Sequence, residues 1–365
     1  MTQRRIRAVF MRGGTSKCLV FHADDLPAEG PERDAVLLAA LGSPDPYGRQ
    51  LDGLGGGISS LSKACIVGSA SRPDADVDYT FAQVEVGVPK VDYRGNCGNC
   101  SSAVGPFAID ERLVKVREGE TTVRIHNTNT RKLILAHVPV HDGEAATAGD
   151  FELAGVPGRG ARIALEFLDP GGAGTGRLLP TGAPRETIDG LEASLVDATN
   201  PVVFVRAADL GLTGAEAPAA VDADRGLSAR LESIRVEAGA RMGIRGSAAI
   251  PKVAFVAAPR PFVTLDGARH EAAACDVLAR VISMGNCHRA FALTAAMCLA
   301  VAARVPGTVV HEVTASADGD VRLGHPSGVL PVAARVEVRG GEARAESVTV
   351  YRTARRLMEG FVRIP

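Results

Sequence analysis

A short sequence recurs half a chain apart and sets the expected architecture. Gly95-Asn96-Cys97 leads into a segment of small apolar residues, and Gly285-Asn286-Cys287 leads, after a few residues, into another, 190 positions further along the 365-residue chain. Both segments are typical of buried helices, because nearly every position is apolar. The recurrence predicts two related halves, each with a central helix whose N-terminus points at a shared cleft. Chance repetition of a common tripeptide is the alternative.

Strands and helices are expected to mix irregularly along the chain. Runs with β-type composition occupy 6–11, 17–21, 77–88, 123–125, 195–205, 253–257, 309–313 and 336–338. Helical patterns occupy 33–41, 101–109, 227–242 and the end of 284–305. Without a strict strand–helix–strand rhythm, the class is α+β or mixed α/β. The Gly- and Pro-rich stretch 157–185 predicts the link between a first domain, 1–185, and a second, 186–365, whose last segment is free to cross back.

Composition excludes several classes of partner. Lys and Arg total 41 against 42 Asp and Glu, and Trp is absent. Such a chain lacks the positive charge of a nucleic-acid-binding protein and the polybasic excess of a membrane-surface protein.

The longest apolar stretch, 290–303, is too short to span a bilayer, and the N-terminus lacks a signal-peptide core. Seven thinly spread cysteines favour a reducing compartment. We therefore expect a cytoplasmic protein without nucleic-acid or membrane partners.

Cys97 and Cys100 form a Cys-x-x-Cys pair that allows three functional interpretations. Structural zinc needs four ligands, and Cys287-His288 is the only candidate to complete them. A redox pair of the thioredoxin type needs a strand before the motif, which the sequence fits loosely. The third interpretation, which we favour, is a functional cysteine at a helix N-terminus, where free amides and the helix dipole lower a thiol pKa and bind carboxylates. An inert buried cysteine is the remaining alternative.

Lys63 is one of only six lysines, against 35 arginines. It follows a glycine-rich loop, 53–57, and precedes an apolar run, 64–67. Desolvation at the mouth of a buried strand would lower its pKa toward that of a usable base, a role closed to arginine. A surface lysine at a strand end is the alternative. The glycine loop lacks the following helix that a dinucleotide-binding fingerprint requires.

Short polar turns supply neutral donors for a small polyanion. They comprise Thr15-Ser16, Asn96, Asn99, Ser283-Met284-Gly285 and His325-Pro326-Ser327-Gly328. Each of these turns taken alone is more often a simple turn than a binding site.

Several segments together resemble the PrpF family, the 2-methylaconitate cis-trans isomerases and their relatives. In order along nearly the whole chain they are MRGGTSK (11–17), DPYGRQLDGLGG (45–56), 62–63, 72–83, GNCGN (95–99), 200–201, 283–288 and GHPSG (324–328). The resemblance implies a diaminopimelate-epimerase-like fold, in which two similar domains each wrap a sheet around a central helix and the site draws on both. The epimerases pair two cysteines at helix starts. Here the second helix starts near 292–294 without a thiol, which argues against a two-thiol racemase.

The resemblance also implies an activity and a set of site residues. The family shifts a C=C bond in di- or tricarboxylic acids by allylic proton transfer, without cofactor or metal. The catalytic residues would be Lys63 and Cys97. The substrate-binding residues would be Arg12, Thr15, Ser16, Asn96, Gly98, Asn99, Ser283, Met284, Gly285, His288, His325 and Ser327.

The expected substrate is 2-methylaconitate or aconitate. Methylitaconate isomerisation, 4-oxalomesaconate tautomerisation and binding of tricarboxylates without catalysis are the alternatives. The expected assembly is a homodimer.

Overall fold

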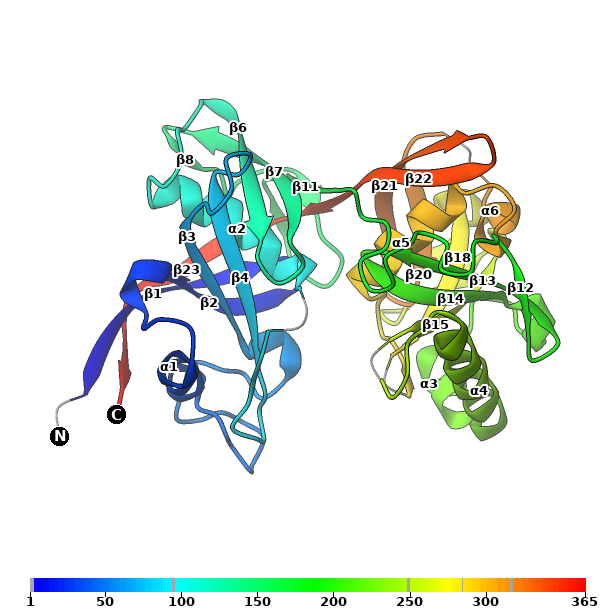
Figure 1. Ribbon diagram of the computed structural model, residues 1–365, viewed down its shortest axis with the longest axis horizontal. Helices are drawn as coiled ribbons and strands as arrows, with labels where there is room; N and C mark the ends of the chain where they lie inside the picture. Colours follow the sequence, from blue (N-terminus) through cyan, green and yellow to red (C-terminus); the bar gives the residue numbers. More distant parts are fainter. Residues whose placement is uncertain (1–2, 94–95, 248–249, 284, 316–317) are drawn as a thin grey trace. The chain divides into compact units, whose positions relative to one another are not determined.

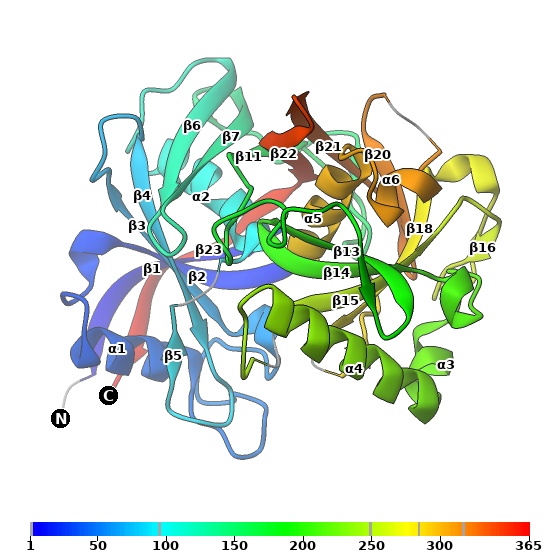
Figure 2. The same cartoon turned by 45° about the vertical axis from the view of Figure 1, so that its right-hand side comes forward.

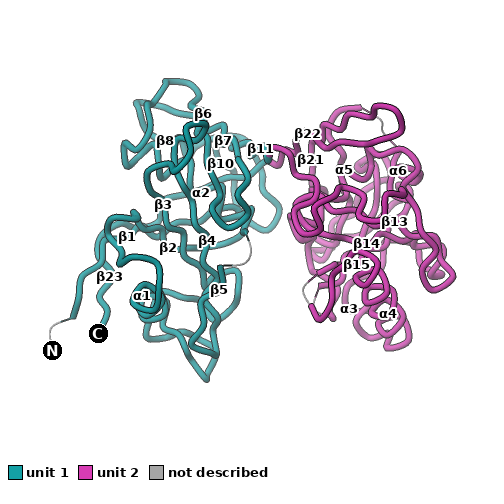
Figure 3. The backbone as a smooth tube through the Cα atoms, in the orientation of Figure 1, with its two compact units in different colours: residues 1–167, 351–365 teal, residues 168–350 magenta. Residues whose placement is uncertain are grey.

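The computed structural model describes residues 3–93, 96–247, 250–283, 285–315 and 318–365. The chain divides into two compact units (Figure 3): unit 1 is Met1–Phe167 with Tyr351–Pro365, and unit 2 is Leu168–Val350. Each unit has a hydrophobic core of its own. None of the helices among the described residues is long and apolar enough to cross a membrane.

Unit 1 is a sheet with strand order β23-β1-β2-β3-β4-β6-β7-β11 (Figure 1). Its elements are β1 (Arg4–Gly13), β2 (Ser16–His22), α1 (Pro31–Leu41), β3 (Lys63–Ser69), β4 (Val77–Val84), β5 (Val91–Asp92), α2 (Gly98–Asp110), β6 (Gly119–Asn127), β7 (Lys132–His141), β8 (Glu144–Ala145), β9 (Phe151–Glu152), β10 (Arg159–Gly160), β11 (Ile163–Leu168) and β23 (Ala354–Ile364). Alternate residues of β2 face different helices, as the period of a strand requires. Leu19 and Phe21 pack in the cluster that contains α1, whereas Cys18 faces α2.

Unit 2 is a second sheet, with strand order β12-β13-β14-β15-β18-β20-β21-β22. Its elements are β12 (Glu186–Ile188), β13 (Leu191–Ala198), β14 (Asn200–Arg206), α3 (Pro218–Ala223), α4 (Arg225–Arg241), β15 (Lys252–Ala257), β16 (Phe262–Val263), β17 (Arg269–His270), β18 (Val277–Ser283), β19 (Asn286–Cys287), α5 (Leu293–Ala303), α6 (Val309–Val313), β20 (Val321–His325), β21 (Gly328–Arg339) and β22 (Glu342–Arg352). Figures 1 and 2 show α4 and α5 on opposite faces of this sheet.

The two sheets repeat one pattern of strand pairing. Read along either strand order, the pairs are antiparallel, antiparallel, parallel, antiparallel, parallel, antiparallel and antiparallel. Parallel neighbours need a crossover connection, and helices lie in all four: α1 and α2 in unit 1, α4 and α5 in unit 2. The predicted pair of related halves, each with a buried central helix, is therefore confirmed.

The boundary between the halves lies earlier than the predicted residue 185. The glycine-rich stretch after β11 is anchored in unit 2, because Oδ2 of Asp197 accepts hydrogen bonds from Gly174 N (2.8 Å) and from Thr175 N (2.7 Å). At the other end of the chain, β23 pairs with β1 from Arg4↔Ile364 to Gly13↔Ala354. The last fifteen residues of the sequence thus belong to unit 1.

One predicted strand is wrong. Residues 309–313 form the short helix α6 rather than a strand. Thr308 caps this helix, since its side chain accepts a hydrogen bond from His311 N at 3.0 Å. A capping threonine favours helix at the residues that follow it, and here the cap outweighs the β-type composition of Val309 and Val310.

Candidate active site

The hairpin between β1 and β2 packs onto the N-terminus of α2. Gly14 turns the hairpin with a positive φ of 51°, and its N–H donates to the carbonyl of Thr353 at 2.9 Å. A Cβ at this position would lie 2.3 Å from Oδ1 of Asn99. Asn99 in turn donates from Nδ2 to Oγ1 of Thr15 at 3.1 Å. Glycine is needed here both for its backbone conformation and for the close approach.

Cys97 caps α2. Its Sγ accepts a hydrogen bond from Cys100 N at 3.4 Å, and Ser16 Oγ lies 4.0 Å from the same sulfur. The amides of the first turn of a helix have no partners within the helix, so this end of α2 offers N–H groups to an anion. The expectation that α2 starts beside a cysteine is confirmed.

Lys63 is the first residue of β3, and it is 8% exposed. Its Nζ donates to Oε1 of Gln83, the residue opposite it on β4, at 2.9 Å, and lies 5.0 Å from the centroid of the Phe81 ring. Lys63 and Cys97 also interact electrostatically, since a charge on either one favours the opposite charge on the other. The amine and the thiol predicted as catalytic partners are therefore adjacent.

The acid–base properties of Lys63 and Cys97 differ from the prediction. Burial lowers the pKa of Lys63, but the charges of deprotonated Cys97 and Cys100 raise it, and the net shift is upward. A side-chain hydrogen bond with Cys100, followed by burial, raises the pKa of Cys97 well above its usual value, against the opposite effects of Lys63 and of the Cys100 amide. The predicted lowering of both pKa values is wrong for the free protein, because the neighbouring thiols outweigh the burial of the amine and the helix N-terminus.

Arg352 is a site residue that the sequence did not reveal. Its Nε donates to Oδ1 of Asn99 at 3.0 Å, and burial lowers its pKa to about 10 although a charge on Cys97 would raise it. It is one of 35 arginines in the sequence and lies 253 residues from Asn99, so no local pattern marks it. Gln83 can likewise be recognised as a neighbour of Lys63 only from the pairing of β3 with β4.

Other predicted residues of unit 1 have structural contacts. Arg12 donates from Nη1 to the carbonyls of Gly14 and Thr353, both at 2.9 Å, and so holds the hairpin against the last strand. Asn96 accepts from Ser101 Oγ at 3.4 Å. Gly98 is the buried first residue of α2. The structure thus gathers the unit 1 candidates around one helix end.

Unit 2 brings some of its predicted residues together around a second lysine. Ser283 Oγ accepts a hydrogen bond from Lys252 Nζ at 3.1 Å. Burial lowers the pKa of Lys252, and Arg235 lowers it further. The pKa of His288 is also lowered, by burial and by the charge of Lys252. The rarity of lysine, which singled out Lys63, would also have found Lys252.

His325 ends β20, and Ser327 lies in the turn between β20 and β21. Nδ1 of His325 accepts from Ser327 N at 3.2 Å, and Ser327 Oγ donates to the carbonyl of Arg289 at 2.6 Å. Gly285 comes directly before β19. Met284 lies outside the described residues.

The second cysteine of the repeat does not begin a helix. Cys287 ends the short strand β19, and its N–H donates to Oδ1 of Asp222 at 2.6 Å. Helix α5 starts six residues later at Leu293, with no side chain capping it. The expected absence of a thiol at the second helix start is confirmed.

Gly14→Ala tests the approach of the hairpin to α2. We expect the free energy of unfolding to fall by about 2–4 kcal/mol, because a positive φ and an overpacked contact with Asn99 add. Gly119→Ala is the matched control: Gly119 has a φ of 85° but open space around its Cβ position, so only about 1–2 kcal/mol should be lost. Urea unfolding measures both, and equal losses would contradict the close contact.

Comparison with known proteins gives the family. The PrpF protein family matches residues 3–365. The 3-methylitaconate isomerase of Eubacterium barkeri is 44% identical, with 99% of this chain and 97% of the relative covered. The 2-methyl-aconitate isomerase of Shewanella oneidensis is 41% identical, with 100% and 98% covered.

Solved structures agree with these relatives. A structure described as methylitaconate-delta-isomerase superposes with a TM-score of 0.91 at 43% identity and covers 100% of this chain and 96% of its own. A hydroxyproline epimerase from Agrobacterium vitis, at 15% identity with 99% and 93% covered, has a TM-score of 0.52 and shows the fold alone. The predicted epimerase-like fold is confirmed. Matches of this length and identity show that the chain belongs to the PrpF family and is an isomerase.

Proposed function

We propose that this isomerase shifts the C=C bond of an unsaturated di- or tricarboxylic acid, such as 2-methylaconitate or aconitate, without a cofactor, and that Lys63 and Cys97 carry the protons. The observation that supports this most directly is the buried amine of Lys63 beside a thiol that caps a helix. A proton carrier needs a group that can exist in two protonation states, and these are two such groups, each of which shifts the pKa of the other.

The N-terminus of α2 is proposed to bind one substrate carboxylate. The amides of Gly98 and Asn99 would donate to it, and the helix dipole favours a negative charge there. Arg352, held against Asn99, adds a buried positive charge to this end of the helix. Thr15 and Ser16 supply hydroxyl donors beside it.

The unit 2 candidates are proposed as further carboxylate ligands. Ser283 and His288 lie near the cation of Lys252, which makes this group a second place where a carboxylate is electrostatically favoured. Ser327 and His325 extend the set with a hydroxyl and an imidazole.

The chemistry is an allylic proton shift. A base removes a proton from the carbon next to the double bond, and negative charge moves onto carboxylate oxygens as a dienolate. Amides preorganised around those oxygens contribute about 3–4 kcal/mol for each donor in comparable sites. Return of a proton at the other end of the allyl unit, from Cys97 or Lys63, completes the shift. Rotation within the intermediate gives cis-trans isomerisation.

The resting pair is proposed to hold two protons at neutral pH, because a hydrogen bond with Cys100 and burial raise the pKa of Cys97 well above its usual value and an amine is ordinarily protonated at that pH. Strongly interacting groups lose their protons as a pair. The form with one proton can be ammonium with thiolate or amine with thiol, and in either arrangement it contains one base and one acid. This form is the proposed catalyst.

The pH profile follows from those shifts. We expect kcat/KM to rise by about tenfold per pH unit below the first pKa of the pair, because the one-proton form grows in that proportion. Initial rates between about pH 6 and pH 9, where the substrate carboxylates are already ionised, measure this. A flat profile through that range would contradict a pair that is fully protonated at neutral pH.

Proton NMR in heavy water tests the function as a whole. The protein is incubated with 2-methylaconitate, cis-aconitate, trans-aconitate, methylitaconate and 4-oxalomesaconate in turn. We expect a shifted double bond and deuterium at the allylic carbon for at least one acid. Binding of an acid without exchange or conversion would support the non-catalytic alternative instead.

A reducing compartment remains our proposal for where this protein works. All seven cysteines are free thiols, as the odd and scattered set of cysteines predicts.

A further inference from the structure

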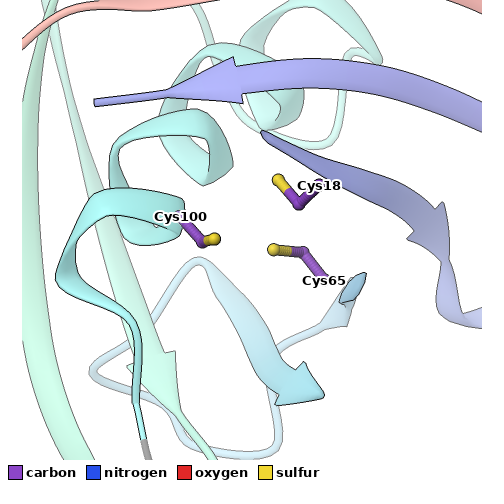
Figure 4. A group of neighbouring side chains, drawn as sticks. All are labelled: Cys18, Cys65 and Cys100. Atoms are coloured by element: carbon purple, nitrogen blue, oxygen red, sulfur yellow. The ribbon is translucent and has the colours of Figure 1, made fainter. Parts of the chain in front are cut away.

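All four cysteines of unit 1 lie around the start of α2. Cys18 is on β2, Cys65 is on β3, and Cys97 caps α2, which contains Cys100. The sulfurs of Cys18, Cys65 and Cys100 lie within 4.8 Å of one another. Figure 4 shows the sulfurs of Cys65 and Cys100 facing each other, with the side chain of Cys18 beside them. Among the described residues, no other group of Cys, His, Asp and Glu side chains meets in this way.

The three thiols are held by buried, regular structure. Their residues are at most 1% exposed. Strands β2 and β3 are parallel neighbours, with Val20 opposite Cys65, so Cys18 and Cys65 are diagonal neighbours on the face that meets α2. Three ligands carried by packed elements are preorganised. Binding of an ion there therefore costs little side-chain conformational entropy.

The donors of the cluster are soft. All three ligand atoms are sulfur, and the hydroxyl of Tyr79 lies 3.9 Å from Sγ of Cys65. Thiolates select zinc, monovalent copper and iron–sulfur clusters, whereas magnesium, calcium and manganese prefer oxygen. A Zn–S bond of about 2.3 Å in a tetrahedron corresponds to sulfurs about 3.8 Å apart. Because the three sulfurs lie within 4.8 Å of one another, movements of these atoms by about 1 Å would bring them to that spacing.

Cys97, which lies outside the group of three sulfurs, is the candidate for the fourth ligand that tetrahedral zinc requires. It precedes Cys100 by three residues, a spacing that is common among zinc ligands, and its sulfur accepts a hydrogen bond from the backbone amide of Cys100 at 3.4 Å. Unlike the other three it is partly exposed, which gives an ion a first point of attachment. The charge also balances: one Zn²⁺ with four thiolates carries two negative charges, and the buried cations Lys63 and Arg352 both interact with Cys97.

We propose that Cys18, Cys65, Cys97 and Cys100 bind one Zn²⁺ ion, with loss of the four thiol protons to solvent. Because the ion takes the sulfur of Cys97, a zinc-loaded molecule would be inactive as an isomerase. This second part rests on the proposed function, whereas the binding itself does not.

Zinc content of the full chain tests the binding. The reduced protein is incubated with ZnSO₄, passed through a desalting column, and analysed for metal and for zinc release by a thiol-modifying mercurial. We expect about one zinc per chain, as for a closed four-ligand site. The Cys18→Ala/Cys65→Ala variant should retain less than about a tenth of that amount, since two ligands cannot close the site. Cys298→Ala, which removes a buried cysteine of unit 2, should bind as the wild type does.

A spectroscopic readout guards against a variant that simply fails to fold. Co²⁺ in a thiolate tetrahedron gives sulfur-to-metal charge-transfer bands, and their intensity should fall stepwise in Cys18→Ala and Cys65→Ser, each checked for native circular dichroism. Wild-type protein that retains no zinc, or folded single variants with unchanged zinc and unchanged bands, would overturn the site.

The activity arm separates the two proposals. Zinc should inhibit the wild type but not Cys18→Ala/Cys65→Ala, which keeps Lys63 and Cys97. Zinc binding without any isomerase activity toward the acid panel would refute the proposed function alone. Activity that a stoichiometric zinc load leaves unchanged would refute the assignment of Cys97 as a ligand.

Discussion

Lys63→Ala is expected to lower kcat by about 10³-fold and to abolish deuterium uptake into the substrate. General acid–base groups contribute about 10²–10⁴-fold to the rate. The substitution removes the amine that interacts with Cys97, and alanine brings no ionisable group in its place. The measurement is NMR in heavy water with whichever acid the panel identifies. A small primary amine added to the solution should restore part of the exchange in the variant, because it can enter the space that the side chain leaves.

The control for this result is Lys90→Ala. Lys90 is also in unit 1, but its side chain is about half exposed and pairs with Asp92 at 3.8 Å, so both exchange and conversion should be unchanged. Wild-type exchange in Lys63→Ala would mean that another group is the base. A low rate without rescue by amines, in a variant that has lost its native circular dichroism, would point to a structural role.

Cys97→Ser is expected to lower conversion by about 10²-fold or more while deuterium exchange at the first carbon persists. The reason is that Lys63 would still remove the proton, whereas a serine hydroxyl is a far weaker acid than a thiol and returns the proton poorly to the other end of the allyl unit. The ratio of exchange to conversion should therefore rise. Both rates come from the same NMR time course.

Cys275→Ser serves as the control, since that thiol lies in unit 2 outside the group around α2. If Cys97 only positioned the substrate, exchange and conversion would fall together and KM would rise. Such a result would assign both proton transfers to Lys63. A variant with unchanged conversion would remove Cys97 from the reaction.

The sequence by itself determined the local features of this protein. The repeated Gly-Asn-Cys segment predicts two halves with central helices, and both helices are present because continuous runs of small apolar residues can be buried on every side. Lysine is rare in this chain, and Lys63 stands at the start of a buried strand. These two local features make it a candidate base. Each of these signals is contained in a few consecutive residues, so no knowledge of the packing is needed to recognise it.

Tertiary structure decided the environment of those residues. Gln83 and Arg352 reach the site only through strand pairing and the return of the chain's end. The upward pKa shifts of Lys63 and Cys97 arise from thiols that come together through packing, and such shifts depend on distance and burial rather than on residue type. The cysteine cluster follows the same rule: Cys100 stands in a Cys-x-x-Cys pair, but nothing in the sequence connects it with Cys18 or Cys65, and only the sheet and α2 bring the three sulfurs together.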